Sequence, residues 1–395
     1  MSTLVFSSVW RLSNPLWRSV RKMSVCFSSS QTSSTKDSIF ERIPREELVP
    51  NIRSGLRDRE FLSGSVDGGF PEFLGVPGDS FPLGLRIING NQFSLGELSA
   101  KCMEYVQENN SLSPAIVFRG LPAKTAEDFL TITQAIKGKP LSYAGGNVPR
   151  PRAIENSEIY QATTEDQAVT IELHHEMAYS SSFPSKESLS FQVFFFCLQE
   201  PADGCGGETP LAKSSEILLK LDPEVVRKFQ SKGVKYAGYW PDKSHAEYAS
   251  WQQQYYTDNK EAEKKAKQLY DTVVWDDNGD MNWSNVKPAF LRHPKTGEDI
   301  WFNQVTIHHH TYHDSLPMFK SIELPPHKYP CTVYYGDGST IEPEVIQHLR
   351  AVSWSCAVGF RWRKGDLLVL DNLTVQHGRI GFTGKREILV HLMTN

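Results

Sequence analysis

The stretch Ile171-Glu172-Leu173-His174-His175-Glu176-Met177 decides how the rest of this sequence is interpreted. It follows Gln167–Ile171, which has the composition of a strand and predicts that the strand continues through it. Because side chains alternate between the faces of a strand, His174 and Glu176 then share one face and His175 lies on the other. An imidazole and a carboxylate on one face supply two adjacent metal ligands. A third ligand is therefore expected from elsewhere in the chain.

Length and composition bound the class of protein. The chain has 395 residues, of which 39% are hydrophobic and 22% charged, as in a soluble globular protein with one large core or two. The net charge of −4 leaves no basic surplus for nucleic acid, and no apolar run approaches the ~20 residues that span a membrane. The six cysteines form no C-x-x-C pair, which argues against a cysteine zinc site and fits a reducing compartment.

The first 36 residues differ from the rest of the chain. They contain many serines and five basic residues but no Asp or Glu, a pattern typical of an organellar transit peptide. We predict a mitochondrial rather than a plastid address, with a disordered basic tail as the alternative. A start at Met23 would instead give a shorter, cytosolic form. Residues 37–395 are predicted to form a single domain.

Apolar periodicity and capping residues predict the elements of that domain. Polar composition at 241–290, with three tryptophans and a charged run, indicates a helical insertion and a candidate lid. The expected helices are 95–109, one opened by Thr125 and Asp128, 215–219, 224–231 and 344–354. The expected strands are 115–118, 189–197, 301–305, 367–370 and 386–392, of which 189–197 is predicted to be buried on both faces.

The third ligand is sought among twelve histidines. His377 follows a buried strand, and Arg386 begins the last strand nine residues later. Arg386 alternates there with Ile388 and Val390, which predicts a guanidinium that faces the core. A buried guanidinium needs a carboxylate partner, and Glu387 points the other way. The carboxylate of a bound ligand is therefore a candidate partner.

Several separate motifs together resemble one known family. They are His174-x-Glu176, Gly206-Gly207-Glu208-Thr209, and Asp371-Asn372 followed by His377-x-Arg379 and Arg386. Their order and spacing resemble the taurine-dioxygenase and clavaminate-synthase-like family of Fe(II)- and 2-oxoglutarate-dependent oxygenases. The resemblance runs from about Ile116 to the C-terminus and includes Pro149-Arg150. It implies a mixed α/β fold, with a double-stranded β-helix (jelly roll) core and flanking helices.

The resemblance also implies the roles of individual residues. His174, Glu176 and His377 would bind iron, and Thr209 and Arg386 would hold 2-oxoglutarate. The interval between His377 and Arg386 is short for the family, so Arg379 is kept as an alternative to Arg386. Glutamate as the second ligand matches the clavaminate-synthase-like branch and argues against halogenation.

The residue types fit the implied chemistry. Two imidazoles and one carboxylate suit Fe(II) and leave three positions open on one face for 2-oxoglutarate and O2. The resemblance implies that 2-oxoglutarate is converted to succinate and CO2 while a small polar substrate is hydroxylated or otherwise oxidised. The alternatives are a non-catalytic metal-binding jelly roll and a metal hydrolase that uses the same ligands.

For several other residues the sequence gives less support for a role in the active site. His175 is expected to be structural, and His308-His309-His310 with His313 is expected to form a loop at the rim of the active site rather than a second metal site. Asn303 and Arg379 are candidates for substrate contact. A zinc-protease helix is excluded because Tyr179 stands where an H-E-x-x-H motif needs its second histidine.

Overall fold

The structure is a computed structural model that describes residues 39–109, 113–143, 150–181, 191–259, 261–294 and 297–394. The chain from Ile39 onward forms one compact unit. The predicted transit peptide lies outside the described residues. Within the described ranges, no helix has both the length and the apolar character needed to cross a membrane.

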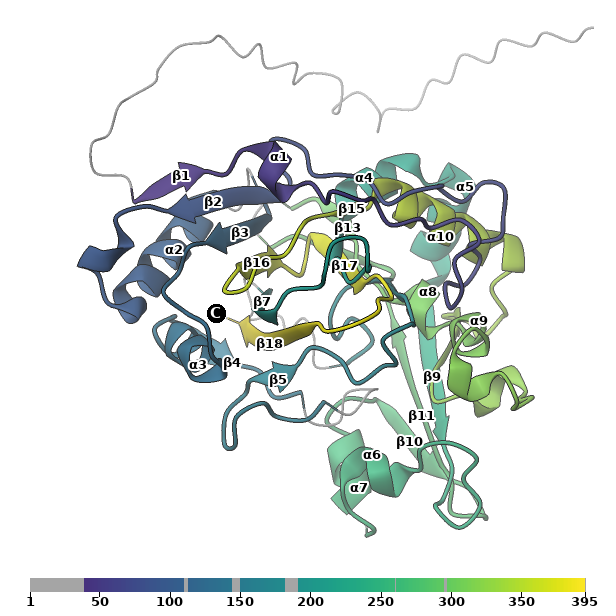
Figure 1. The fold of residues 1–395 in the computed structure, drawn as a ribbon. Coiled ribbons are helices and arrows are strands. Elements are labelled where there is room, and N and C mark those ends of the chain that lie inside the picture. The colour runs from purple at the N-terminus through teal and green to yellow at the C-terminus, as the bar shows by residue number, and fades with distance from the viewer. Residues whose placement is uncertain are drawn as a thin grey trace, which may run out of the picture. The chain divides into compact units, whose positions relative to one another are not determined.

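The largest element is an eight-stranded sheet in the order β1-β2-β3-β16-β7-β18-β4, with β5 also paired to β18 (Figure 1). Neighbouring strands are antiparallel except β2 and β3, which are parallel. The strands are β1 Phe40–Arg42, β2 Leu83–Ile87, β3 Ala115–Arg119, β4 Lys139–Pro140, β5 Tyr160–Gln161, β7 Phe191–Gln199, β16 Leu367–Asp371 and β18 Glu387–Thr394.

Strand β7 separates two hydrophobic cores. Phe194 and Phe196 pack toward helices α2 (Leu95–Asn109) and α3 (Ala126–Gln134), and Phe196 stacks on Phe129 with 5.2 Å between ring centroids. The alternate side chains, such as Phe195, enter a second core on the other face. Burial of both faces explains the aromatic run and confirms the predicted two-sided strand.

A smaller four-stranded sheet covers that other face. Its order is β15-β8-β17-β6, and all its pairs are antiparallel. Its apolar side chains join the core that contains Phe195, whose ring lies 5.2 Å from the ring of His377. The two sheets therefore pack face to face. The strands are β6 Ile171–His174, β8 Pro210–Lys213, β15 Val358–Gly359 and β17 Val375–Arg379.

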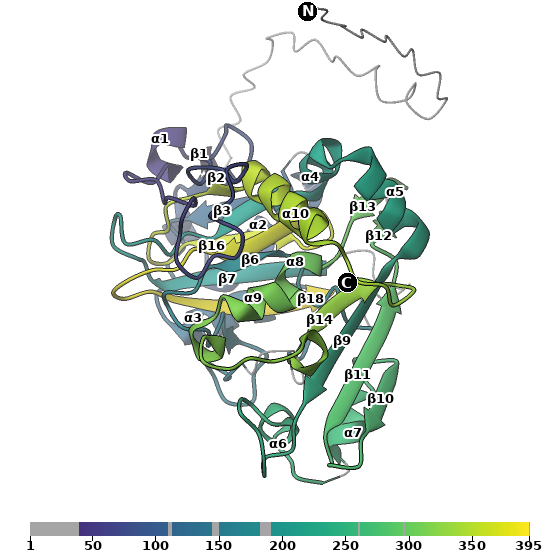
Figure 2. The same cartoon turned by 90° about the vertical axis from the view of Figure 1, so that its right-hand side faces the viewer.

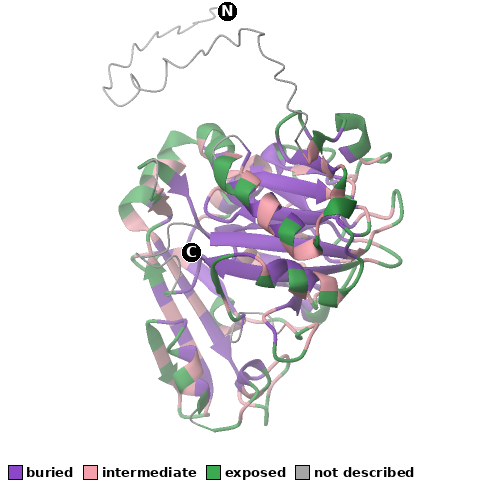
Figure 3. Cartoon of the chain, turned by 90° about the vertical axis from the view of Figure 1, so that its left-hand side faces the viewer, coloured by how far each residue is buried: buried purple, intermediate pink, exposed green. Residues whose placement is uncertain are grey.

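Helices cover the outer surfaces, with their exposed sides to solvent and the strands buried beneath them (Figure 3). The predicted capping box forms from Thr125 and Asp128, and Asp222 also caps the helix that begins at Pro223. The remaining helices are α1 Arg45–Leu48, α4 Ser214–Lys220, α5 Pro223–Lys232, α6 Trp251–Tyr255, α7 Glu261–Ala266, α8 Val305–His308, α9 His310–Asp314 and α10 Pro343–Cys356, with 3-10 turns η2 Gly90–Gln92, η3 Pro317–Phe319 and η4 Pro326–Lys328.

The segment predicted as a helical insertion is only partly helical. A third sheet of order β10-β11-β9-β14 projects from the two main sheets, with α6 and α7 near its far end (Figure 2). Strand β11 alternates buried Met281 and Trp283 with more exposed residues, a strand period that the polar composition obscured. The strands are β9 Val234–Trp240, β10 Thr272–Trp275, β11 Met281–Lys287 and β14 Thr332–Tyr335, beside the hairpin of β12 Phe290–Arg292 and β13 Asp299–Trp301.

Two strand predictions were wrong. Residues 167–170 precede β6 as a turn, because the Asp166 side chain accepts a hydrogen bond from the Ala168 amide and stabilises a local bend. Strand β13 ends at Trp301, and the side-chain oxygen of Asn303 accepts from the Val305 amide at the start of α8. In both places a short polar side chain bonds to the nearby backbone and replaces the sheet ladder.

Candidate metal and 2-oxoglutarate site

Antiparallel pairing brings the two histidines of the site together. Strand β17 pairs with β6 so that His377 lies directly opposite His174, with 4.5 Å between ring centroids. The ligand atoms of His174, Glu176 and His377 all lie within 4.8 Å of one another, and all three residues are buried. Among the described residues, this is the only group of three or more His, Cys, Asp or Glu side chains with such spacing. The sequence-predicted triad therefore converges at one point.

Glu176 reaches the site through a turn. Strand β6 ends at His174, and Met177 adopts the left-handed region with φ of 59°. Asn372 fixes this turn: its side-chain oxygen accepts from the Glu176 amide at 2.7 Å, and its side-chain nitrogen donates to the Glu176 carbonyl at 3.0 Å. The prediction that Glu176 lies on the same strand face as His174 was therefore wrong, because the strand has already ended. The carboxylate returns to the side of His174 because the turn is held by the segment that leads into β17.

Two side chains hold the Glu176 carboxylate. The Tyr143 hydroxyl donates to Oε1 at 3.0 Å, and Arg150 Nη2 lies 3.4 Å from Oε2 while its guanidinium stacks over the Tyr143 ring at 3.9 Å. Burial alone would raise the pKa of Glu176, but the charge of Arg150 and the hydrogen bond with His377 outweigh it and hold the pKa well below its usual range. The ligand is therefore an anion in a buried setting.

The histidines supply the nitrogen donors of the site. Nδ1 of His174 bonds to the Glu172 carbonyl at 2.8 Å, which leaves Nε2 for a metal. Burial, with a further contribution from His377, lowers the pKa of His174 to about 3. Nδ1 of His377 is buried and has no hydrogen-bond partner among the described residues. Two neutral imidazoles and one carboxylate are a donor set that suits Fe(II), so the residues fit this metal.

His175 has a different role from its two neighbours. Its Nδ1 lies 2.6 Å from the Asn372 carbonyl, and its Nε2 lies 2.9 Å from the Ser214 hydroxyl and 3.0 Å from the Trp301 carbonyl. Burial lowers the pKa of His175 to about 4, so the ring is neutral and only one of its two nitrogens donates. The fully buried ring joins β6 to three other segments, as expected for a structural histidine.

Arg386 and Thr209 lie in the same cavity as the triad. Arg386 Nε donates to the Gly207 carbonyl at 2.7 Å, and Nη2 lies 3.4 Å from the Thr209 hydroxyl. The approach needs glycine at 207, which has φ of +84° and leaves only 3.0 Å between an added Cβ and Arg386. Burial lowers the pKa of Arg386 to about 9, and this cation forms no ion pair with a carboxylate of the described residues. A ligand carboxylate would therefore fit here.

The remaining predicted residues lie outside the metal cluster. Arg379 lines the cavity, but its guanidinium donates to the backbone carbonyls of Glu165, Asp166 and Val169. Asn303 does not line it, and its amide bonds to the Ala289 carbonyl, so its position gives no support to a substrate contact. The predicted histidine loop instead forms helices α8 and α9, of which His308 and His313 line the cavity.

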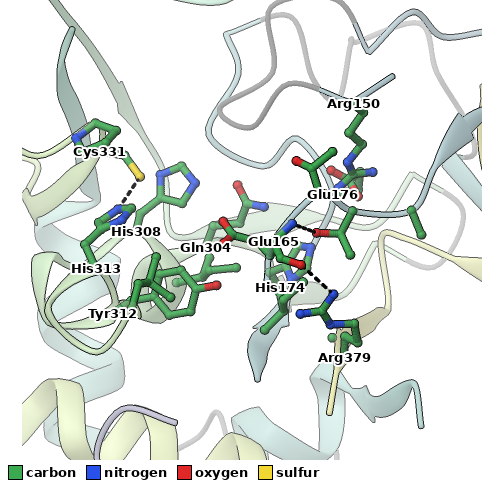
Figure 4. A pocket seen from close by; sticks show the side chains of 18 of the residues that line it. Arg150, Glu165, His174, Glu176, Gln304, His308, Tyr312, His313, Cys331 and Arg379 are labelled. Atoms are coloured by element: carbon green, nitrogen blue, oxygen red, sulfur yellow. Dashed lines mark hydrogen bonds and ion pairs between the residues drawn. The ribbon is translucent and has the colours of Figure 1, made fainter. Parts of the chain in front are cut away.

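The cavity has a volume of about 330 Å³ and extends from the triad to a largely aromatic wall. Figure 4 shows His174 and Glu176 of the triad, with Tyr312, His308 and His313 across the cavity. That wall comes from β9, α9, η3 and the loop before α6. Its aromatic members are Trp240, Tyr248, Tyr312 and Phe319. Sequence reasoning missed these residues and Tyr143, because nothing local marks a side chain whose partner is distant. Arg150 and Asn372 belong to the motifs Pro149-Arg150 and Asp371-Asn372, and the family resemblance of these motifs could have indicated a role in the site.

The chain matches the model of the family described as "Taurine catabolism dioxygenase TauD, TfdA family" over residues 86–393. It is 30% identical to a clavaminate synthase-like protein of Arabidopsis thaliana over 289 residues, 71% of this chain and 81% of that one. It is 29% identical to the dapdiamide synthesis protein DdaC of Enterobacter agglomerans over 291 residues, 73% and 84% of the two chains.

Two solved structures are also similar. One is PvcB of Pseudomonas aeruginosa, with a TM-score of 0.43 and 19% identity over 79% of this chain and 84% of that one. The other is asparagine oxygenase in complex with Fe(II), 3-hydroxyasparagine and succinate, with a TM-score of 0.43 and 14% identity over 75% and 79%.

The matched family defines the class: an Fe(II)- and 2-oxoglutarate-dependent oxygenase, and so an oxidoreductase. This chain belongs to the TauD/TfdA family, as the resemblance of its motifs predicted. Its cofactor is Fe(II), and its co-substrates are 2-oxoglutarate and O2.

Proposed function

We propose that the protein is a dioxygenase that hydroxylates, or otherwise oxidises at a C–H bond, a small molecule held in the 330 Å³ cavity, with release of succinate and CO2. One observation carries the proposal: the guanidinium of Arg386, half-buried and without an ion pair among the described residues, lies in the same cavity as the His174, Glu176 and His377 cluster. A structural metal site has no need of such a cation.

Each group of residues then has a task. His174, Glu176 and His377 would bind Fe(II), and Arg386 with Thr209 would bind the distal carboxylate of 2-oxoglutarate. When bound, the iron couples oxidative decarboxylation of 2-oxoglutarate to oxidation of the substrate. The protein contributes orientation and the exclusion of water, because the ligands lie in the core between the two sheets.

The double-stranded β-helix is part of this proposal. Two mostly antiparallel sheets share one apolar core, and His174 and His377 lie on adjacent strands of the smaller sheet. This arrangement is what a jelly roll would give, with the metal at the inner face of one sheet. The third sheet would then be an addition that completes the substrate side of the cavity.

The substrate expectation changes in one respect. A small polar molecule was expected from the sequence, but most of the wall far from the triad is aromatic or aliphatic. A substrate with an apolar body fits this wall better than a wholly polar one, because burial of apolar surface contributes about 25 cal/mol per Å².

Succinate formation tests the proposal. Purified protein is supplied with Fe(II), 2-oxoglutarate and a panel of small molecules, with and without O2. We expect succinate that depends on Fe(II) and O2 and increases when a substrate is present. Turnover of a panel member without O2 would instead favour a metal hydrolase. The absence of succinate from protein shown to bind Fe(II) and 2-oxoglutarate would contradict catalysis.

A further inference from the structure

The cavity contains five charged side chains besides its histidines, and four of them have evident tasks. Arg150 pairs with Glu176, which belongs to the metal cluster. Arg386 is the anchor proposed for 2-oxoglutarate, and Arg379 donates to backbone carbonyls. The fifth, Glu165, has a side chain with no hydrogen bond and no ion pair among the described residues. Glu165 therefore has no role in the binding of Fe(II) or 2-oxoglutarate as proposed above.

The backbone holds Glu165 firmly at the cavity wall. Its amide donates to the Thr163 hydroxyl at 3.0 Å, and its carbonyl accepts from Arg379 Nη1 at 3.2 Å. Glu165 and Tyr312 both line the cavity, and Figure 4 shows the two side chains with the metal ligand His174 in view. The carboxylate therefore lies on the wall of the space into which a substrate must fit.

No cation of the described residues forms an ion pair with this carboxylate. Burial raises the pKa of Glu165, and the charge of Arg379 offsets this effect only in part. The two cavity histidines on the far side are neutral, because burial lowers the pKa of His308 well below its usual range and that of His313 to about 4. A half-buried carboxylate without a partner is unfavourable, so a positive ligand would stabilise it.

A second acceptor lies in the same cavity. Gln304 is only 5% exposed, and its side-chain oxygen has no hydrogen-bond partner among the described residues. An ammonium group carries three N–H donors, and it can bond to a carboxylate and an amide oxygen together. The faces of Trp240, Tyr248 and Tyr312 add a setting that is favourable for a cation and for an apolar body.

We propose that Glu165, assisted by Gln304, binds a protonated amine of the substrate, so that the substrate is an amine with an apolar body directed along the aromatic wall. The proposal names the substrate class of the active site proposed above and rests on that function. Its chemistry is recognition only: the amine stays protonated, and the oxidised C–H bond belongs to the part of the molecule that faces the metal.

The test compares three probes of equal chain length: n-pentylamine, n-pentanol and pentanoate. Binding is measured by titration calorimetry with the full-length protein, loaded with Fe(II) and 2-oxoglutarate without O2. We expect pentylamine to bind about tenfold or more tightly than pentanol, the size of a charge-assisted hydrogen bond at a partly exposed site, and pentanoate to bind most weakly. Because a free amine can also ligate iron, the titration is repeated with metal-free protein, where the same order is expected.

Two variants test whether the charge of Glu165 causes the preference for the amine. Glu165→Gln keeps the shape but removes the charge, and it should lower pentylamine affinity about tenfold while pentanol affinity stays within about twofold. Glu155→Gln removes the charge of an exposed side chain that does not line the cavity, and should change neither. Equal binding of amine and alcohol, preference for pentanoate, no amine binding at millimolar concentration, or an unchanged Glu165→Gln variant would overturn the proposal. The metal-free titration decides it even if 2-oxoglutarate turnover fails.

Discussion

The two sides of the cavity are built in different ways. On the metal side, two ligands face each other across one strand pair, β6 and β17, and the third follows two residues after His174. On the substrate side, the wall comes from a loop near Glu165, strand β9, helices α8 and α9 and turn η3. The sheet register fixes the metal side, whereas long-range packing of separate additions fixes the substrate side. Substitution of a few residues on the metal side should therefore abolish catalysis, whereas substrate specificity should depend on many residues on the other side.

Among substitutions that test the difference between the two sides of the cavity, we expect the largest effect at Arg386. Arg386→Ala removes a half-buried cation beside Thr209, and we expect the KM for 2-oxoglutarate to rise by an amount equivalent to about 2 kcal/mol or more. The iron ligands should still bind Fe(II). Steady-state assays at varied 2-oxoglutarate measure the change. Arg292→Ala, at an exposed site, is the matched control, and an unchanged KM in Arg386→Ala would contradict the assignment.

The next effect separates adjacent histidines. His175→Ala removes a fully buried ring that bonds to Asn372 and Ser214, so we expect the free energy of unfolding to fall by about 1 to 3 kcal/mol. The folded variant should still bind Fe(II), because His175 is not among the converging ligands. Urea unfolding and iron titration measure the two properties. His327→Ala, at an exposed position, should change neither; a His175→Ala protein of normal stability would contradict the structural role.

A smaller effect, on Fe(II) affinity, is expected at Tyr143. Tyr143→Phe removes only the hydroxyl that donates to Glu176 Oε1, and loss of such a partner to a ligand carboxylate lowers metal affinity about tenfold. Anaerobic Fe(II) titration measures the affinity. Tyr256→Phe, which alters a tyrosine that is 74% exposed, is the control. Equal Fe(II) affinity in Tyr143→Phe and the native protein would show that this hydrogen bond does not support the ligand.

The contrast also explains what the sequence could predict. Strand β7 and helix α2 follow from periodicity and capping, because burial and backbone satisfaction act over a few residues. The candidate ligands His174, Glu176 and His377 were predicted from the resemblance of separate motifs, and the structure brings them together. The reasoning for Glu176 was incomplete, since a turn held by Asn372 places it rather than strand alternation.

The substrate side could not be predicted in the same way. The segment 241–290 has the polar composition of a solvated insertion, yet β10 and β11 extend a sheet whose buried face includes Trp283. Glu165 gave no signal, because an acidic residue in a polar loop is ordinarily exposed. Its position in the cavity depends on the bonds of Arg379 to the loop backbone, which join residues more than 200 positions apart.

The most direct test of the central claim is optical. Addition of Fe(II) and 2-oxoglutarate without O2 should give the native protein a weak visible charge-transfer band, as expected of a 2-oxo acid that would chelate Fe(II) held by His174, Glu176 and His377. His377→Ala should abolish the band, whereas His310→Ala, in α9 and outside the ligand cluster, should retain it. A normal band in His377→Ala would contradict the assignment of His174, Glu176 and His377 as the iron site.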